Sequence, residues 1–445
     1  MPSLHLVSLG CPKNLVDSEL MLGLLEQDGW QVVEDPRLAD LLLINTCGFI
    51  QSAVEEAIAE ILDLSVYKQE NPEKFLVVTG CLVQRYGAEL INELPEVDLF
   101  LGTEAVPEIV AQINDLRQGE LVDKVLVPGP FLMTSDLPRR ISTPFYRSWL
   151  KITEGCDNRC SYCLIPSIRG DLRSRTIDDL TVEAVRLESG GVRELCLIAQ
   201  DLTAYGDDLQ SGVALPDLLK NLLTETTIPW LRLLYLYPAG VNERLLELMA
   251  RENRILPYLD IPMQHVSSAV LRRMNRRYTT EDLYAMIDMI RQYLPDVALR
   301  TTMMVGFPGE TEADVRELEA FLRSARIDHV GSFVYANEPG APSELFAGQV
   351  DDGEGQERMA RIMAVQSEVS AGLQQRYVGR IEPVLLEGLS RESDLLLEGR
   401  TRFQAPDIDG CVYITDGEAM PGDIVQVRIN EAQIYDLVGE IVGPA

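Results

Sequence analysis

Short apolar runs alternate with amphipathic segments over residues 1–120. The apolar runs lie at residues 4–10, 41–46, 75–80 and 97–103, and helical periodicity covers residues 14–28, 51–65, 84–93 and 105–117. Short strands that alternate with helices indicate a parallel sheet whose strands are joined by crossover helices. The first section of the chain is therefore predicted to be an α/β domain.

A second series of strands and helices begins near residue 147. Its apolar runs lie at residues 148–153, 194–201, 230–238, 258–264, 298–308 and 329–336, with helical patterns between them at 215–226, 279–294 and 310–325. Six such units predict a partial or full TIM-like barrel. Its functional residues are expected in the loops after the strands.

Five short apolar runs with glycine-containing turns follow residue 376, at 383–389, 395–401, 411–416, 423–429 and 435–442. They predict a small OB-like β-barrel, a shape often used to hold nucleic acid or an extended peptide. A helix around 355–375 should connect it to the central barrel, and residues 121–144 read as a linker. The predicted domains are residues 1–125, 142–375 and 376–445.

The composition indicates a soluble, acidic protein. No apolar stretch of the 445 residues approaches the ~18 to 20 needed to cross a bilayer, and the start of the chain lacks the features of a signal peptide, so we expect a cytoplasmic location. The net charge is −31, and all three sections are acidic, the last by −7. Such a surface favours a basic partner over a phosphate backbone, although acidity can also serve solubility alone.

Three cysteines, Cys156, Cys160 and Cys163, form a CxxxCxxC motif after the first strand of the predicted barrel. Cysteines at this spacing can ligate three irons of a 4Fe-4S cluster and leave the fourth iron open. An open iron can bind S-adenosylmethionine (SAM), and one electron from the cluster can then cleave SAM to a 5'-deoxyadenosyl radical. The alternative is a structural zinc site, which normally needs a fourth ligand nearby.

Three more cysteines, Cys11, Cys47 and Cys81, each stand just after a predicted strand of the first domain. The carboxyl ends of parallel strands share one edge of a sheet, so these thiols can converge and hold a second cluster. Packing in the core is the alternative. Cys196 and Cys411 lie inside apolar runs and are expected to be buried core residues.

Other residues in the barrel loops are weaker candidates for contacts with SAM. They are Tyr162, Gln200, Asp201, Arg300 and the segment 306–310. Each is equally typical of an ordinary loop, cap or turn. His5, His265 and His329 are expected to be structural, although a histidine can also act as a general base.

The motifs resemble those of the methylthiotransferases, and within them the RimO family. SLGCPKNLVDSE, INTCGFIQSAVEEAI, LKITEGCDNRCSYCLIPSIRG and YLDIPMQH carry the resemblance, which spans essentially the whole chain. It implies an amino-terminal methylthiotransferase domain, a radical SAM domain and a TRAM domain. One departure is IAQD after the second barrel strand, where radical SAM enzymes in general carry GGE.

The resemblance also implies a reaction, cofactors and partners. Cys156, Cys160 and Cys163 would hold the SAM cluster, and Cys11, Cys47 and Cys81 an auxiliary one. SAM would serve as methyl donor and as radical source, and a methylthio group would be inserted at the β-carbon of an aspartate in ribosomal protein uS12, free or within the small subunit. A reductant protein and a sulfur donor would be needed. Methylthiolation of a tRNA adenosine and a non-catalytic iron–sulfur redox or scaffold protein are the alternatives.

Overall fold

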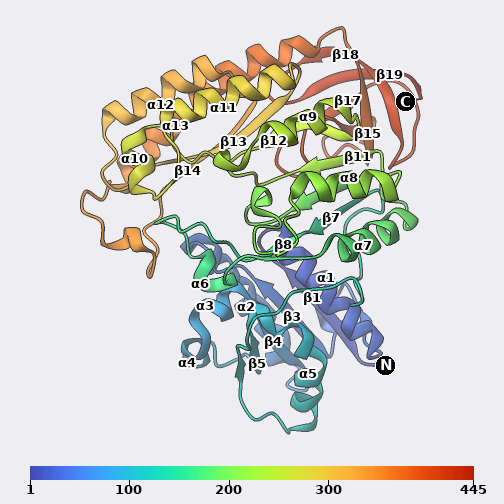
Figure 1. Ribbon diagram of the computed structural model, residues 1–445. Helices are drawn as coiled ribbons and strands as arrows, with labels where there is room; N and C mark the ends of the chain where they lie inside the picture. Colours follow the sequence, from blue (N-terminus) through green and yellow to red (C-terminus); the bar gives the residue numbers. More distant parts are fainter. Residues whose placement is uncertain (445) are drawn as a thin grey trace.

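A parallel six-stranded sheet forms the amino-terminal part of the computed structural model, which describes residues 1–444 (Figure 1). The strand order is β2-β1-β3-β4-β5-β6. The strands are β1 (Ser3–Ser8), β2 (Gln31–Val32), β3 (Leu41–Thr46), β4 (Phe75–Gly80), β5 (Leu99–Leu101) and β6 (Val125–Leu126). All six residues of β3 are buried, as expected for a central strand with helices on both faces.

Five α-helices cover this sheet, and alternate residues of β3 show which helices lie on which face. The helices are α1 (Pro12–Gln27), α2 (Gln51–Glu70), α3 (Cys81–Tyr86), α4 (Leu90–Glu93) and α5 (Ile109–Gln118). Leu41 and Leu43 pack with α1 and α5, whereas Leu42 and Ile44 pack with α2, α3 and α4. The predicted α/β domain is confirmed.

Two details of this domain differ from the expectation. The helix expected at 84–93 is broken into α3 and α4, because Gly87 takes φ +51° in the turn between them. The helix expected at 105–117 begins as a 3₁₀ turn that contains Pro107 and becomes α-helical only at Ile109. The edge strands β2 and β6 have two residues each, too few to show a pattern in the sequence.

The central part contains a second parallel sheet of six strands, in the order β14-β13-β12-β11-β10-β7. They are β7 (Arg147–Lys151), β10 (Glu194–Ile198), β11 (Trp230–Leu233), β12 (Ile255–Asp260), β13 (Ala298–Val305) and β14 (His329–Val334). This sheet is a curved partial barrel, so of the two expected forms the partial one is present. A short hairpin of β8 (Thr153–Glu154) and β9 (Arg173–Ser174) follows β7.

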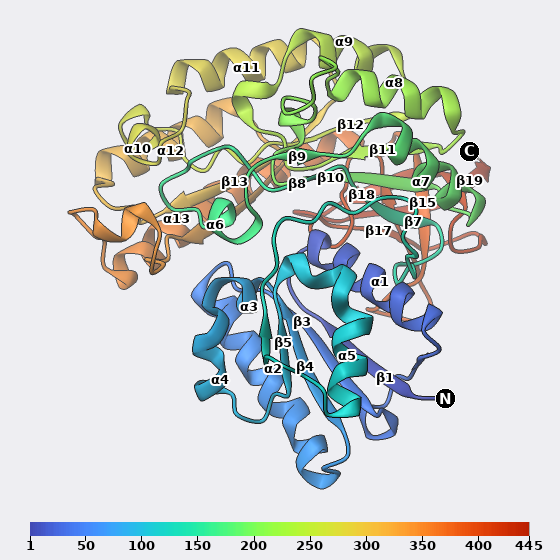
Figure 2. The ribbon, with the colours of Figure 1, turned by 60° about the horizontal axis from the view of Figure 1, so that its bottom comes forward.

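The outer face of the partial barrel is covered by helices of the central domain (Figure 2). They are α7 (Ile177–Ser189), α8 (Leu215–Glu225), α9 (Glu243–Arg251), α10 (Ser268–Arg273), α11 (Thr280–Tyr293), α12 (Glu312–Ala325) and α13 (Asp352–Gln374). Leu195 and Leu197 of β10 pack toward them. Cys196 and Ile198 point to the other face and pack in a core that includes residues of the carboxyl-terminal barrel.

The carboxyl-terminal part is a closed five-stranded barrel, as the sequence predicts. Its strands are β15 (Ile381–Leu389), β16 (Leu397–Thr401), β17 (Val412–Ile414), β18 (Ile424–Ala432) and β19 (Leu437–Pro444). Cys196 is fully buried, as expected, but Cys411 is only partly buried because it precedes β17 at the surface. No helix within residues 1–444 is both long and apolar enough to span a membrane.

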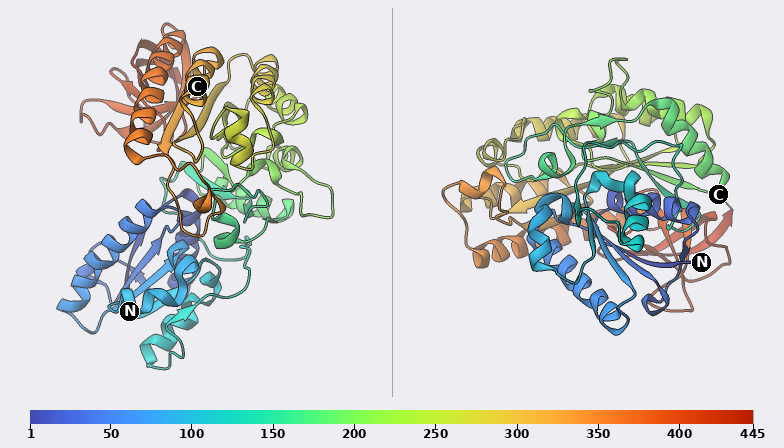
Figure 3. Two further views of the ribbon diagram at one scale, coloured as in Figure 1. Left: turned by 90° about the vertical axis from the view of Figure 1, so that its left-hand side faces the viewer. Right: turned by 90° about the horizontal axis from the view of Figure 1, so that it is seen from below.

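The amino-terminal sheet lies beneath the central barrel, with the carboxyl ends of its strands toward the segment that contains α6 (Ile165–Arg169) (Figures 1 and 3). Arg85 pairs with Glu338 across this boundary at 3.1 Å, and Arg139 of the linker pairs with Glu19 of α1 at 2.7 Å. All four side chains are nearly buried. The carboxyl edge of the amino-terminal sheet, where functional loops are expected, therefore faces the part of the central domain that contains α6.

Candidate active site

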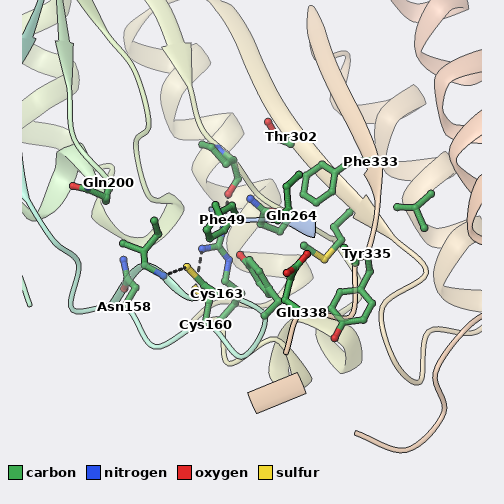
Figure 4. A pocket seen from close by; sticks show the side chains of 18 of the residues that line it. Phe49, Asn158, Cys160, Cys163, Gln200, Gln264, Thr302, Phe333, Tyr335 and Glu338 are labelled. Atoms are coloured by element: carbon green, nitrogen blue, oxygen red, sulfur yellow. Dashed lines mark hydrogen bonds between the residues drawn. The ribbon is translucent and has the colours of Figure 1, made fainter. Parts of the chain in front are cut away.

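The loop from Cys156 to Cys163 forms one wall of a cavity of about 770 Å³ at the carboxyl ends of the barrel strands (Figure 4). All three cysteines of the loop line this cavity. The Ile165 N–H donates to Cys163 Sγ over 3.4 Å, and Arg276 Nη1 donates to Cys160 Sγ over 3.6 Å. The loop therefore presents three thiols and two sulfur-directed donors to one space.

A backbone turn at Gly155 gives the loop its shape. Gly155 has φ +73°, and a Cβ at this position would lie 2.1 Å from the carbonyl oxygen of Asp171. Only glycine fits such a conformation and so close an approach. The turn allows the loop to fold against the segment after α6, which brings Cys156 beside the later two cysteines.

The chemistry of these thiols fits an iron–sulfur cluster. Burial is the main cause that raises the pKa of Cys156 to about 11 and that of Cys163 to about 12, so both are neutral thiols without a metal. A bound iron would ionise them, because metal coordination deprotonates a thiol. Within residues 1–444, no group of three or more His, Cys, Asp or Glu side chains is arranged to hold a single metal ion.

The second set of cysteines lies at the carboxyl edge of the amino-terminal sheet. Cys11 is the N-cap residue of α1, Cys47 follows β3, and Cys81 opens α3 directly after β4. Electrostatic interactions connect all three, since Cys11 acts on Cys47 and both act on Cys81. The shared strand-end position thus does bring the three thiols into one neighbourhood.

Small residues beside these cysteines let the loops touch. A Cβ on Gly10 would lie 2.9 Å from the Cβ of Cys47, and a Cβ on Gly48 would lie 2.7 Å from the backbone of Leu82. The loop of Cys11 therefore contacts the loop of Cys47, which in turn contacts the backbone beside Cys81. Larger residues at these glycines would separate the thiols.

The two cysteine sets meet across the domain boundary. Cys81 packs in a buried cluster with Leu164, Ile168 and Ala341 of the central domain. Leu164 is the residue directly after Cys163. One apolar side chain therefore links the loop that carries the first thiol set to a cysteine of the second.

A buried arginine reinforces this junction. Arg169 at the end of α6 places Nη2 3.4 Å from Cys81 Sγ and also bonds Asn14 Oδ1. Its Nη1 lies 2.7 Å from Asp17 of the amino-terminal domain and 3.3 Å from Glu154, two residues before Cys156. Arg169 thus contacts a thiol of one set and a carboxylate beside the other.

The rest of the cavity offers polar groups that lack partners. The side-chain oxygens Gln200 Oε1 and Gln264 Oε1 are buried without a hydrogen-bond partner in residues 1–444. Gln200 also donates to Glu154 over 2.9 Å. Two lining residues, Tyr235 at φ +63° and Gln264 at φ +71°, occupy the left-handed region that is costly for residues other than glycine. Unpaired acceptors and local strain fit a cavity made to hold a ligand such as SAM.

The other candidates from the sequence are divided between the cavity and the protein framework. Tyr162 and Gln200 line the cavity. Asp201 instead accepts hydrogen bonds from Asn158 and Thr203, and Arg300 pairs with Asp260 at 2.9 Å.

The remaining polar candidates are also structural. Glu310, from the segment 306–310, pairs with Arg358 at 2.8 Å and lies 3.5 Å from buried His265. His329 contacts the carbonyl oxygen of Phe403 in the terminal barrel, and His5 contacts that of Val33. The structural interpretation of the three histidines is thus supported.

Sequence reasoning missed several lining residues. They are Phe49, Asn158, Tyr235, Gln264, Thr302 and Glu338. Tyr235 and Gln264 belong to the apolar runs 230–238 and 258–264, which predicted strands there, whereas the structure ends these strands at Leu233 and Asp260 and places both residues in the loops that follow. Their conformations depend on contacts between strands, such as the bridge of Gln264 with Met303.

Comparison with known proteins agrees with this three-part organisation. Residues 3–102 match a family described as uncharacterized protein family UPF0004, residues 150–322 match the radical SAM superfamily, and residues 378–442 match the TRAM domain. The protein named ribosomal protein uS12 methylthiotransferase RimO from Desulfotalea psychrophila is 57% identical over 98% of this chain and 99% of its own length. The chain belongs to the RimO family. Proteins of the same name from Geotalea uraniireducens and Geobacter sulfurreducens are 48% and 46% identical, each over 98% of both chains.

Solved structures share the fold of this RimO-family chain. The radical SAM methyltransferase TsrM from Kitasatospora setae superposes with a TM-score of 0.56 at 14% identity, covering 88% of this chain and 78% of TsrM. The radical SAM enzyme OxsB gives the same TM-score and identity, covering 81% of this chain and 56% of OxsB. These likenesses concern architecture. The family and the radical SAM match establish an enzyme that uses SAM and iron–sulfur chemistry to transfer a sulfur-containing group.

Proposed function

We propose that this chain inserts a methylthio group at the β-carbon of an aspartate side chain in ribosomal protein uS12. The family relationship supports the reaction, because RimO proteins carry this substrate in their name. The observation that carries the proposal within this molecule is the junction at Cys81. There Leu164 and Arg169 join the two cysteine sets beside one cavity. A reaction that needs both a radical and a sulfur group requires such closeness.

Cys156, Cys160 and Cys163 are proposed to hold one 4Fe-4S cluster, and Cys11, Cys47 and Cys81 a second. With SAM bound, these groups would supply one-electron chemistry and the methylthio group. The chain's own residues would orient and shield them. Gln200 and Gln264 line the cavity with side-chain oxygens that lack partners within residues 1–444, and Tyr162 of the cysteine loop lines it too. The electron is proposed to come from a reductant protein and the sulfur from a separate donor.

Charge supports a basic protein as the substrate. The cavity lining includes Glu338 and Asp352, and Arg276 is its one basic residue. The chain carries 70 acidic and 39 basic residues, and its TRAM barrel is acidic too. Such a surface attracts a basic ribosomal protein and repels RNA phosphates. A ribosomal substrate also agrees with the cytoplasmic location expected from the sequence.

Mass spectrometry on two substrates tests the proposal. Purified uS12 and bulk tRNA would each be incubated with anaerobically reconstituted enzyme, SAM, reductant and sulfide. We expect one methylthio group on an aspartate of uS12 and none on tRNA. Modification of tRNA alone would support the alternative, in which the same reaction methylthiolates a tRNA adenosine. Absence of both products and of SAM cleavage would support the other alternative, a non-catalytic iron–sulfur redox or scaffold protein.

A further inference from the structure

A second groove, of about 710 Å³, lies on the opposite side of the cysteine loop from the main cavity. Successive residues of the loop belong alternately to the two spaces. Cys160 and Tyr162 line the cavity, whereas Arg159 and Ser161 line the groove. Its full lining is Arg159, Ser161, Arg272, Arg273, Asn275, Pro342, Leu345, Phe346 and Ala347. The lining residues come from the cysteine loop, from α10 and the residues just after it, and from the segment after β14, and α10 and that segment lie near each other at one end of the barrel (Figure 1).

This groove is a basic island on an acidic protein. None of its nine lining residues is acidic, and residues 261–280 include four arginines and no Asp or Glu. Arg272 is exposed and has no ion-pair partner within residues 1–444. Arg273 donates only to the carbonyl oxygens of Pro308 and Ala347, so its charge is not neutralised. Arg159 does pair with Asp171 at 2.6 Å, but both side chains are exposed.

The rim also offers an apolar contact. Leu345 has 88% of its surface exposed, next to the half-buried ring of Phe346. Arginine combined with exposed apolar residues is typical of protein interfaces.

Hydrogen bonds connect the groove directly to the cysteine loop. Asn275 Nδ2 donates to the carbonyl oxygen of Arg159 over 2.6 Å, and the Ser161 N–H donates to that of Met274 over 3.0 Å. Ser161 Oγ donates to the carbonyl oxygen of Arg273 over 2.9 Å. Arg159 and Ser161 line the groove and are the two chain neighbours of Cys160. One peptide unit therefore separates the groove's lining from a proposed cluster ligand.

We propose that this groove docks an acidic one-electron carrier protein that reduces the cluster held by Cys156, Cys160 and Cys163. The inference rests on the proposed function, because it assumes a cluster at these cysteines. One electron leaves the carrier's iron–sulfur centre and enters the cluster, so the carrier is oxidised by one electron and no bond or proton moves. The basic groove would repel a basic substrate and attract an acidic carrier. Substrate and reductant can therefore use opposite sides of the same loop.

Charge reversal in the groove tests the docking. The variant Arg272→Glu/Leu345→Glu changes two exposed lining residues whose side chains form no hydrogen bond with any of residues 1–444. The matched control Arg193→Glu/Leu395→Glu changes the net charge equally at two exposed positions, one before β10 at the far end of the barrel and one in the TRAM barrel. Reduced plant-type ferredoxin serves as the probe, and stopped-flow absorbance follows its oxidation by excess reconstituted enzyme. Dithionite, a small reductant that needs no docking, drives parallel reactions.

We expect the groove variant to lower the ferredoxin rate constant ~10-fold at low ionic strength, with the difference shrinking as salt is added. SAM cleavage driven by dithionite should match the parent protein, and the control should retain the ferredoxin rate. Equal ferredoxin rates in variant and parent, or equal losses in variant and control, would overturn the proposal. If dithionite yields no 5'-deoxyadenosine with the parent protein, the proposed function itself fails. The milder Arg272→Gln/Leu345→Gln replaces the first variant if that does not fold.

Nucleic acid is the other polyanion that could fit a basic groove. Binding of a fluorescent small-subunit rRNA fragment to the same variants separates the two. Lost RNA binding with an unchanged ferredoxin rate would assign the groove to RNA and reject the carrier. Unchanged RNA binding with a reduced ferredoxin rate is the expected result.

Discussion

Arg169 Nη2 lies 3.4 Å from Cys81 Sγ, although the two residues are 88 positions apart and belong to different domains. Arg169 ends the short helix α6, which begins two residues after Cys163. The same guanidinium holds Asp17 and Glu154, one from each domain. Movement of either domain would break these bonds, so Arg169 fixes the position of one thiol set relative to the other.

The bond from Arg169 to Cys81 is predicted to strengthen iron binding at the second cysteine set. In Arg169→Lys the charge is kept for Asp17 and Glu154, but the forked donor that also reaches Cys81 is lost. We expect a chelator to remove iron from this set ~10 to 100-fold faster, because mutation of a residue that bonds a metal ligand typically weakens metal binding by such a factor. The measurement uses a background of Cys156→Ala/Cys160→Ala/Cys163→Ala, so that only the second set can bind iron.

A comparison variant separates this effect from general instability. Arg169→Gln leaves two buried carboxylates, Asp17 and Glu154, to share the single charge of Lys151, and it should cost about 3–5 kcal/mol of unfolding free energy. The lysine variant should unfold close to the parent by urea titration. Iron retention in the lysine variant equal to that of the parent would contradict a role for the N–H to sulfur bond.

Loss of a cysteine from the cavity loop should stop SAM cleavage. In Cys160→Ala the cluster loses one of three ligands, and the sulfur contact with Arg276 is lost as well. We expect no 5'-deoxyadenosine by liquid chromatography after incubation with dithionite and SAM. Cys196→Ala, in the core of the barrel sheet and outside both thiol sets, is the matched control. Continued formation of 5'-deoxyadenosine by Cys160→Ala would reject the assignment of the triad.

Loss of a cysteine from the second set should have a different result. Cys47→Ala leaves the cavity loop intact, so SAM cleavage should persist while uS12 gains no methylthio group. Both products can be quantified by mass spectrometry in the same reaction. Methylthiolated uS12 formed by this variant would remove the second set from the mechanism.

The sequence was sufficient for the parts of the site that depend on strand order. Cys11, Cys47 and Cys81 could be grouped because each follows a parallel strand, and the ends of parallel strands share an edge. The motif of Cys156 to Cys163 could be placed at the barrel's carboxyl face by the same argument. The periodicity of short apolar runs also predicted both sheets and the five-stranded barrel.

The contacts between domains could not be predicted in this way. Nothing in the sequence near Arg169 indicates that it reaches Cys81, because that contact depends on how two sheets are docked. Arg300 was a candidate for SAM binding by its place on a barrel strand, yet its side chain pairs with Asp260 on the strand beside it. Periodicity defines which residues are apolar and buried, whereas a buried charge is explained only by its partner.

Glu194 is such a buried charge, and it predicts how the TRAM barrel responds to acid. It lies at the start of β10 with no exposed surface, and it pairs with Arg232 Nε at 2.6 Å and with Arg400 Nη2 of the TRAM barrel at 2.5 Å. Burial opposes ionisation of Glu194, but the two arginines outweigh it and lower its pKa to about 2. The ionised carboxylate therefore joins the two domains at neutral pH.

The lowered pKa sets the direction of the pH dependence. The free energy of unfolding contributed by ionised Glu194 is fully present above the unfolded-state pKa near 4.5. It is lost as the pH falls through the folded-state pKa of about 2. At roughly 1.4 kcal/mol per pKa unit, the loss from pH 5 to pH 2 is about 3 kcal/mol. Glu194→Gln should cost about 3–5 kcal/mol at pH 7, because the buried guanidinium of Arg232 loses its carboxylate partner and Arg400 keeps its pair with Glu387 but loses Glu194.

Urea unfolding of the parent and of Glu194→Gln between pH 5 and pH 3 checks this prediction. The parent should lose stability more steeply than the variant as the pH falls, since the variant has no carboxylate to protonate at this position. Glu440→Gln is the control, because its pair with Arg428 is partly exposed at 3.0 Å and should contribute at most about 1 kcal/mol. Parallel pH profiles for the parent and Glu194→Gln would mean that this carboxylate does not join the TRAM barrel to the central domain.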